Sequence, residues 1–294
     1  FVTTPIFYVN GDPHIGSCYA ILAADMIARF HRLMKCDVKF LTGKDEHGKK
    51  IEQSAKKANK DCQQFVDEVS QKFREMREFM DFSTDYFSAI NDNFIRTTNP
   101  VHKKIVQDIW RLMVKNGWIY EGKYTGWYCV SDEAYYTEDE LIKDETGKFF
   151  TEIGKEVEWR EEESYFFKLS EFQNILLELY KRKPEFIQPD DKRNEIIAFV
   201  SGLSIKDFEE GKAPKTNYLQ DISVTRNNFD WGIRIPCDLK GKELLDEKFE
   251  WKNDLIQKEK HVIYVWLDAL FNYITALGGL NSDEYNKYWK DGKV

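Results

Sequence analysis

Residues 1–48 constrain the fold most, because a strand-like segment, a turn-rich loop, a helical segment and a second strand-like segment follow one another there. Residues 1–4 are aromatic and β-branched until Pro5 interrupts them, and residues 38–42 form a second apolar run that Gly43 closes. Two strands joined by a crossover helix lie parallel, whereas a hairpin needs only a tight turn. The order of segments therefore predicts a parallel α/β sheet.

The helical segment, residues 17–33, carries apolar residues at the spacing i, i+3, i+4 and i+7. This rhythm is typical of an amphipathic helix whose apolar face packs on a sheet. We therefore expect that face to be buried. Its members are Tyr19, Leu22, Ala23, Met26, Ile27, Phe30 and Leu33.

The character of the sequence changes after Gly117. Residues 118–129 alternate aromatic and polar side chains with glycines, which is typical of short antiparallel strands. We interpret the middle region as a mixed α+β insertion that interrupts the first pattern.

The first pattern resumes near the C-terminal end of the sequence. Residues 222–225 are strand-like, and residues 261–267 are almost continuously apolar, as in a strand buried on both faces of a parallel sheet. Trp266 is expected to end that strand, and Asp268 to open the next helix. The expected parts are residues 1–112, 113–220 and 221–294.

Composition excludes several classes of protein. A hydrophobic content of 42% in 294 residues supports a packed core of about two domains and excludes general disorder. No apolar run approaches a membrane span, and residues 1–4 lack the basic start of a secretory signal. The net charge of −8 means that contact with RNA would need a local basic surface.

Cysteine usage also restricts the chemistry. The chain has five cysteines, an odd number, and none forms a CxxC pair. This argues against a disulfide scaffold and against a zinc knuckle, and favours a soluble protein of a reducing compartment. The cysteines are Cys18, Cys36, Cys62, Cys129 and Cys237.

Residues 13–17 follow the first strand and open the first helix. Ligands of open parallel sheets bind at the carboxyl ends of strands, and helix N-termini there favour phosphate. His14 could donate to a phosphate oxygen, and Gly16 would let a base approach the backbone. The alternative is an ordinary loop histidine and a turn glycine.

Residues 43–48 follow the second strand and therefore lie on the same rim. Asp45 could pair with a substrate ammonium group. Alternatively, Asp45 or Glu46 could cap the N-terminus of a helix. A metal site is disfavoured, because three adjacent residues of a turn cannot all converge on one ion.

Residues 264–273 place aromatic and apolar side chains one helical turn apart. Such a set is often simply core. Its position at the C-terminal end of a strand favours a pocket wall instead, formed by Trp266, Leu270 and Tyr273.

Three strings in this order resemble the class I aminoacyl-tRNA synthetases, and within that class the methionyl branch. The first is FVTTPIFYVNG followed by PHIGS, in which HIGS stands for the HIGH signature. The second is LTGKDEHG at residues 41–48, and the third is YVWLDA at residues 264–269, preceded by ISVTR and WGI. The likeness spans nearly the whole chain.

This resemblance implies a Rossmann-type catalytic domain that a connective-peptide insertion splits. It also implies ATP-dependent activation of methionine to methionyl-adenylate, followed by transfer to tRNA(Met) in the cytoplasm or an organelle. The implied partners are methionine, ATP with Mg²⁺ and tRNA(Met), with no membrane. A thioether gains about 0.3–1.5 kcal/mol against aromatic edges, so an aromatic wall suits methionine.

Site residues follow from matching positions. The resemblance gives catalytic roles to His14 and Ser17. It gives ATP binding to His14, Gly16, Ser17, His47 and Gly48. It gives methionine binding to Pro5, Ile6, Tyr8, Asp45, Val265, Trp266, Ala269, Leu270 and Tyr273, with Asp45 holding the ammonium group.

The sequence departs from the family pattern in three ways. Ser17 replaces the second histidine of the signature, where its hydroxyl could donate to phosphate and cap the helix. Residues 124–140 contain only Cys129, so we expect no structural zinc there. No KMSKS-type loop is present, so we expect a missing C-terminal part, or a separate chain, to complete the sheet, the pocket and an anticodon-binding domain.

Two alternatives stay open at this point. One is a sibling class I synthetase for cysteine or a branched aliphatic amino acid, although a cysteinyl enzyme would need zinc and a branched-chain enzyme a longer insertion. The other is a binding module that kept the fold without the chemistry.

Overall fold

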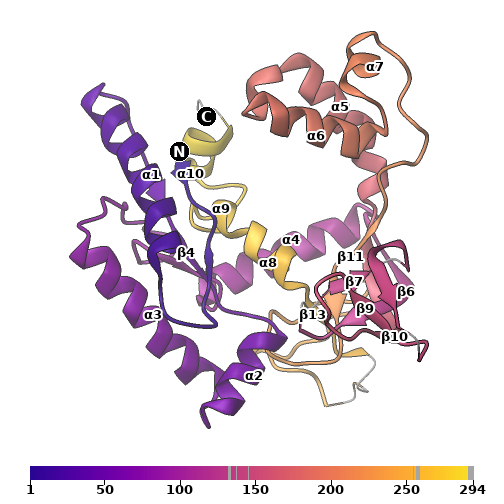
Figure 1. Cartoon of the computed structure of the whole chain (residues 1–294). Coiled ribbons are helices and arrows are strands. Elements are labelled where there is room, and N and C mark those ends of the chain that lie inside the picture. The colour runs from indigo at the N-terminus through magenta and orange to yellow at the C-terminus, as the bar shows by residue number, and fades with distance from the viewer. Residues whose placement is uncertain (132–133, 137, 145, 254, 256–258, 291–294) are drawn as a thin grey trace.

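The computed structural model describes residues 1–131, 134–136, 138–144, 146–253, 255 and 259–290. Figure 1 shows an indigo and purple α/β body, an insertion in magenta and orange, and a yellow C-terminal segment that returns to the body. Among the described residues, no helix combines the length and the hydropathy that a membrane crossing needs.

Two small parallel sheets organise the body, whose strands run in parallel as the sequence predicts. Strand β1 pairs in parallel with β3, and β4 lies between β2 and β5, parallel to both. A Cβ atom on Gly43 would lie 2.2 Å from Ile95 Cγ2, so only glycine lets these two strands approach. Gly43 therefore starts β4 and does not end a strand. The strands are β1 (Val2–Thr3), β2 (Phe7–Tyr8), β3 (Phe40–Leu41), β4 (Gly43–Asp45) and β5 (Ile95–Arg96).

Four helices accompany these strands (Figure 1). The first, second and fourth begin after a strand, and the third follows the second helix. They are α1 (Ile15–Leu33), α2 (Lys49–Lys57), α3 (Cys62–Phe79) and α4 (Pro100–Lys115). The core between sheet and helices includes Val9, Ile51, Val66, Phe73 and Phe94.

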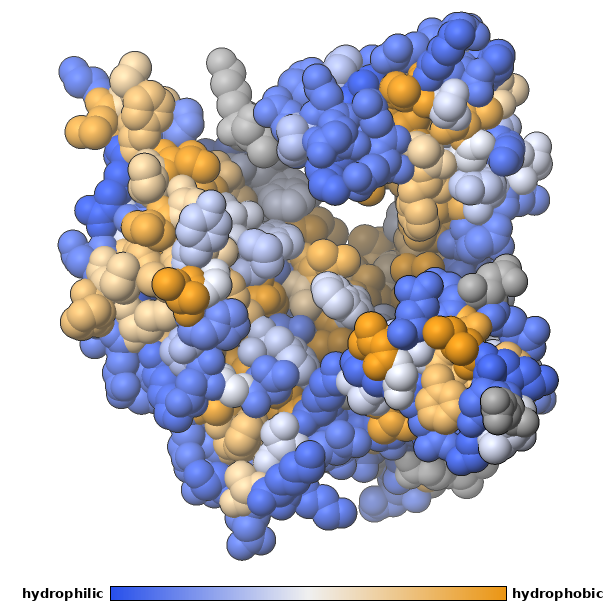
Figure 2. All heavy atoms as spheres, in the orientation of Figure 1, coloured by the Kyte–Doolittle hydropathy of each residue, from blue (hydrophilic) through white to orange (hydrophobic). Residues whose placement is uncertain are grey.

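Helix α1 turns its larger apolar face to solvent, so the predicted face was wrong. The buried side chains are Ser17, Ile21, Ala24, Asp25 and Ala28. The buried carboxylate of Asp25 accepts hydrogen bonds from Ser83 N (2.7 Å) and Ser83 Oγ (2.6 Å), and this polar anchor sets the rotation of the helix. Figure 2 shows apolar side chains gathered over α1. The exposed residues are Tyr19, Leu22, Ala23, Met26, Ile27, Phe30 and Leu33.

The insertion is of mixed α+β type. Strands β6 and β10 form a long antiparallel pair, with β7 on one side and β11 on the other, and a helical lobe stands apart from this sheet (Figure 1). The strands are β6 (Ile119–Cys129), β7 (Ala134–Tyr136), β8 (Leu141–Lys143), β9 (Phe149–Thr151), β10 (Glu158–Phe167) and β11 (Ile222–Ser223). The helices are α5 (Gln173–Arg182), α6 (Asp190–Ser201) and α7 (Ile205–Glu209).

The C-terminal segment differs from the expected strand at residues 261–267. Strand β13 (Val262–Ile263) is short and pairs antiparallel with β12 (Thr225–Arg226). The N–H groups of Leu267 and Asp268 donate to Tyr264 O (2.9 and 3.1 Å), which turns the chain into a helix. A short apolar run has no period that separates strand from helix, so Trp266 was misplaced in a strand. The helices are α8 (Val265–Leu270), α9 (Asn272–Thr275) and α10 (Asp283–Tyr285).

Candidate active site

A cavity of about 320 Å³ lies where the ends of β2 and β4 meet α8 and α9. It brings together all nine residues that the sequence assigned to methionine: Pro5, Ile6, Tyr8, Asp45, Val265, Trp266, Ala269, Leu270 and Tyr273. Lys50, Tyr264 and Asn272 also line it and were not predicted. What this cavity binds stays a prediction, but three segments distant in sequence do converge on it.

The polar end of the cavity comes from the parallel strands. Tyr8 and Asp45 are direct partners in the register of β2 and β4. Both residues end their strands, so their side chains meet at the carboxyl edge of the sheet, where such sheets bind ligands. The Lys50 side chain adds a cation from the first turn of α2. The cavity therefore offers one carboxylate and one ammonium group beside an apolar wall.

The apolar wall is one face of the α8–α9 segment. Trp266, Ala269, Leu270 and Tyr273 follow the spacing i, i+3, i+4 and i+7, which places them on one side of a helix. The Trp266 side chain is 66% exposed and Leu270 is 57% exposed. Large apolar side chains this open to solvent are suited to covering a ligand.

A buried polar network holds α8 against the sheet. The Asp268 carboxylate bonds His47 Nδ1 (2.6 Å) and His102 Nε2 (2.7 Å), and His102 Nδ1 lies 2.7 Å from Thr275 Oγ1. Burial would raise the pKa of Asp268, but the two histidines outweigh it and lower that pKa to about 2. The network ties the segment after Asp45 to α4, α8 and α9. Sequence reasoning missed His102 because no local spacing links it to Asp268.

Strand β4, which ends at the cavity, and the residue that follows it carry buried charged side chains. The Glu46 carboxylate accepts hydrogen bonds from Arg96 Nε (2.8 Å) and from the hydroxyls of Ser70 and Thr98. Lys44 is fully buried, and this burial lowers the pKa of its ammonium group to about 7, although Glu46 opposes the shift. Among the described residues, no group of three His, Cys, Asp or Glu side chains could hold a metal ion.

The residues predicted to bind ATP do not line this cavity. His14 is the N-cap of α1, and its Nδ1 accepts a hydrogen bond from Gly16 N (3.1 Å). Because Nδ1 accepts, a neutral His14 ring carries its proton on Nε2 and can donate it outward. Ser17 is buried in the first turn, so the expectation that it caps the helix was wrong. A Cβ atom on Gly16 would lie 2.9 Å from His14 Cε1, which explains the glycine.

His47 and Gly48 lie at the end of the segment that follows β4. Both are buried, and the His47 ring is bonded to Asp268. His47 Nε2 has no hydrogen-bond partner within the part of the chain that the structure describes. The ring therefore serves the buried network in this structure.

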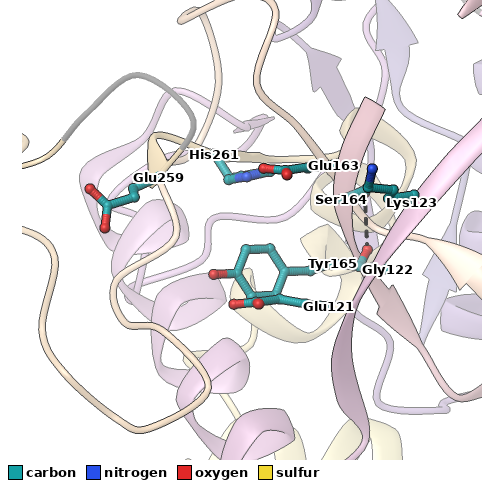
Figure 3. Close-up of a pocket in the computed structure, with 8 residues that line it drawn as sticks. All are labelled: Glu121, Gly122, Lys123, Glu163, Ser164, Tyr165, Glu259 and His261. Atoms are coloured by element: carbon teal, nitrogen blue, oxygen red, sulfur yellow. Dashed lines mark hydrogen bonds between the residues drawn. The ribbon is translucent and has the colours of Figure 1, made fainter. Parts of the chain in front are cut away.

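Figure 3 shows another cavity, of about 450 Å³, between the insertion sheet and the segment that leads into β13. Glu121, Glu163 and Glu259 line it together with Tyr165 and His261. Burial and the neighbouring Glu121 raise the pKa of Tyr165. Lys123 also lines the cavity but is paired with Glu161, so the three carboxylates leave it acidic and unsuited to a nucleotide.

Comparisons with known proteins bear on the whole chain. A family model described as tRNA synthetases class I (M) matches residues 1–294. The methionine–tRNA ligase of Rickettsia conorii is 46% identical over 291 residues, which are 98% of this chain and 48% of that protein. That of Thermotoga maritima is 42% identical over 290 residues, covering 98% of this chain and 39% of that protein.

A solved structure is also similar. The crystal structure of Mycobacterium tuberculosis methionyl-tRNA synthetase bound by methionyl-adenylate has a TM-score of 0.78 and 38% sequence identity to this chain. The match covers 98% of this chain and 49% of that one. The chain therefore spans no more than about half the length of the relatives it matches.

Proposed function

The chain belongs to the methionyl branch of the class I tRNA synthetases, and from this membership we propose that it carries the methionine-activating part of a methionine–tRNA ligase. One observation carries the proposal within the chain itself. Residues from β2, from β4 and from α8–α9 converge on a single cavity that has a carboxylate at one end and an aromatic wall at the other.

The proposed reaction has two steps. A carboxylate oxygen of methionine attacks the α-phosphorus of ATP, which arrives with Mg²⁺, and pyrophosphate leaves. A terminal ribose hydroxyl of tRNA(Met) then attacks the carbonyl carbon of methionyl-adenylate, and AMP leaves with the bonding electron pair. Both steps depend on positioning and charge neutralisation more than on a protein nucleophile.

Methionine would enter with its ammonium group toward Asp45 and its thioether toward the α8–α9 face. A carboxylate–ammonium contact is charge-assisted and fixes the orientation of the amino acid. The Trp266 indole and the Tyr273 ring supply the aromatic edges that favour sulfur. A difference of one methylene group is worth only about 1–3 kcal/mol in such a pocket, so shape alone gives limited selectivity.

ATP would bind along the N-terminal end of α1. His14 Nε2 is available to donate to a phosphate oxygen, and the positive end of the helix favours the same group. We propose that Gly16, Ser17 and Gly48 shape this rim. Because the His47 ring is bonded to Asp268, we expect its contribution to come from its backbone.

The remaining half of the protein would cover the apolar face of α1. Phe30 is 58% exposed and Leu33 is 81% exposed, and continuous apolar faces of this kind mark contact surfaces. Relatives carry roughly as many residues again beyond the matched part. We propose that this half supplies the pyrophosphate-binding loop and the anticodon-binding domain, and that the present chain divides near residues 112 and 220.

We also propose that the insertion needs no zinc. Asp132 and Glu133 of that segment lie outside the described residues.

Calorimetric titration with a panel of amino acids tests the proposal. We expect the chain to bind methionine, norleucine less tightly, and leucine or cysteine weakly. Preference for leucine, isoleucine, valine or cysteine would favour a sibling synthetase. If no amino acid bound, the proposal would fail and a binding module would be the better interpretation.

A further inference from the structure

A third cavity, of about 360 Å³, lies between the N-terminal half of α4, residues 230–234 and residues 248–250. We call it the α4 cavity. We propose that it binds a backbone phosphate of the tRNA substrate. This inference rests on the proposed function, because tRNA is the polyanion that such a synthetase must hold.

Charge is the first observation. Four cationic side chains line the α4 cavity: Lys103, Lys104, Arg234 and Lys248. Two carboxylates line it, those of Asp230 and Glu250, and Glu250 is already paired with Arg234. The cavity is therefore locally basic in a chain whose net charge is −8. An acidic protein that binds RNA needs such a local basic surface.

Lys103 is the second observation, because its ammonium group lies at the cavity without a counter-ion. The side chain is half-buried, and its Nζ lies 5.8 Å from the centre of the Trp231 ring. Within the residues that the structure describes, no carboxylate lies within ion-pairing distance of it. Burial lowers the pKa of Lys103, although Asp268 opposes the shift. A partly desolvated cation of this kind gains most from an anion that enters the cavity.

The arrangement suits a phosphodiester better than a small carboxylate ligand. Lys104 and Lys248 are exposed at the rim, on different elements, whereas Lys103 lies deeper. A strand of RNA that follows the rim can place one phosphate at Lys103 and neighbours at the outer lysines. Contacts of this sort bind without reading sequence, and they make affinity depend on salt.

The α4 cavity adjoins the segment that carries Asp45. Trp231 Nε1 donates to Glu46 O (2.6 Å), and Gly48 N donates to Trp231 O (3.1 Å). The Trp231 ring also meets the His47 ring at a centroid distance of 5.6 Å. RNA held at Lys103 would therefore lie beside the methionine cavity, as transfer of the methionyl group requires.

The cavity of Figure 3 has the opposite character. Its glutamates Glu121, Glu163 and Glu259 repel phosphate, so the same RNA strand is kept away from that side of the insertion.

Fluorescence anisotropy with labelled tRNA(Met) and the whole 294-residue chain tests the inference. We expect Lys103→Gln to weaken binding about tenfold, as the loss of a charge-assisted contact does. It should also reduce the slope of log K against log salt by roughly 0.7–0.9, and Lys248→Gln by a similar amount. The matched control is Lys206→Gln on α7, whose side chain is 82% exposed. We expect it to leave both values unchanged.

Competition distinguishes the sources of phosphate. Pyrophosphate or ATP that displaced tRNA from the wild type and lost affinity in Lys103→Gln would reassign the cavity to a free nucleotide and overturn the RNA assignment. So would equal tRNA affinity in the wild type and Lys103→Gln, or no tRNA binding by the wild type. Methionine titration of the same variant should match the wild type, and its unfolding temperature should be no lower, which separates a failure here from a failure of the proposed function.

Discussion

Helices α8 and α1 both expose large apolar side chains, but for different reasons. On α8, Trp266 and Leu270 stand over a cavity that also contains Asp45, and a buried network braces the helix from behind. On α1, exposed apolar side chains form an open stripe (Figure 2), and Phe30 is one of these exposed residues. An exposed apolar side chain thus indicates a ligand site where it lines a cavity together with a charged group and where buried hydrogen bonds hold its helix in place. A continuous helical stripe without these features indicates a contact surface.

Removing the buried hydrogen-bond network that holds α8 in place should have the largest effect on the stability of the protein. In Asp268→Asn, the ring nitrogens of the buried His47 and His102 lose the carboxylate that they share. We expect the free energy of unfolding to fall by about 2–4 kcal/mol, because two buried hydrogen bonds to a carboxylate are disrupted. Chemical denaturation measures it, with Asp191→Asn, an exposed residue of α6, as the control. If both variants lowered the free energy of unfolding by the same small amount, the network would not be needed to hold α8 in place.

Lys44, buried in β4, makes the stability of the region around the methionine cavity depend on pH. Its pKa is about 7 in the folded protein and near 10.5 in the unfolded chain, so the unfolded chain binds more protons between these values. Stability contributed at this site should therefore rise as pH increases from about 7 to 10.5.

The variant Lys44→Met removes that titration. At pH 6, where most of the buried ammonium group is charged, we expect the variant to be about 1–4 kcal/mol more stable than the wild type. The difference should shrink as pH rises, because the wild type then loses the buried charge. Denaturant unfolding at several pH values measures it, and a difference independent of pH would contradict the interpretation.

Matched truncations compare the two exposed aromatic residues directly. Trp266→Ala should weaken methionine binding about tenfold, because it removes wall area and the sulfur–aromatic contact. Phe30→Ala on α1 should leave methionine affinity unchanged. Calorimetric titration of both variants measures the contrast, and a similar loss in both would make α8 no more a pocket wall than α1.

The smallest effect is expected on the α1 stripe. Phe30→Glu should change the stability of this chain by no more than about 0.5 kcal/mol, because the side chain is already exposed. It should instead reduce association with the remaining half of the protein, measured by co-purification when the two parts are expressed together. A large loss of stability in the chain alone would mean that the stripe is covered from within.

Local patterns predicted those parts of the structure that depend on strand order and helical spacing. The sequence order of strand, helix and strand was enough to expect Asp45 at the carboxyl edge of a parallel sheet, because parallel strands end together. The spacing of Leu270 and Tyr273 was enough to expect a common helical face, although Trp266 was expected in the preceding strand. Both features are found in the structure.

Contacts between distant residues could not be predicted in the same way. The pairing of His102 with Asp268 joins positions 166 residues apart, and no periodicity encodes it. The rotation of α1 is set by Asp25 and Ser83, also far apart, and this polar anchor outweighed the larger apolar face. The hydrophobic pattern alone therefore predicted the burial of the wrong face of that helix.

A thermodynamic cycle between Asp45 and the ammonium group of the ligand tests the central claim most directly. Calorimetry would compare methionine with its analogue lacking the amino group, on the wild type and on Asp45→Asn. We expect a coupling free energy of about 1.5–3 kcal/mol, because the two partners form one charge-assisted hydrogen bond. A coupling near zero would mean that Asp45 does not hold the amino group, and it would contradict the account of this cavity as the methionine site.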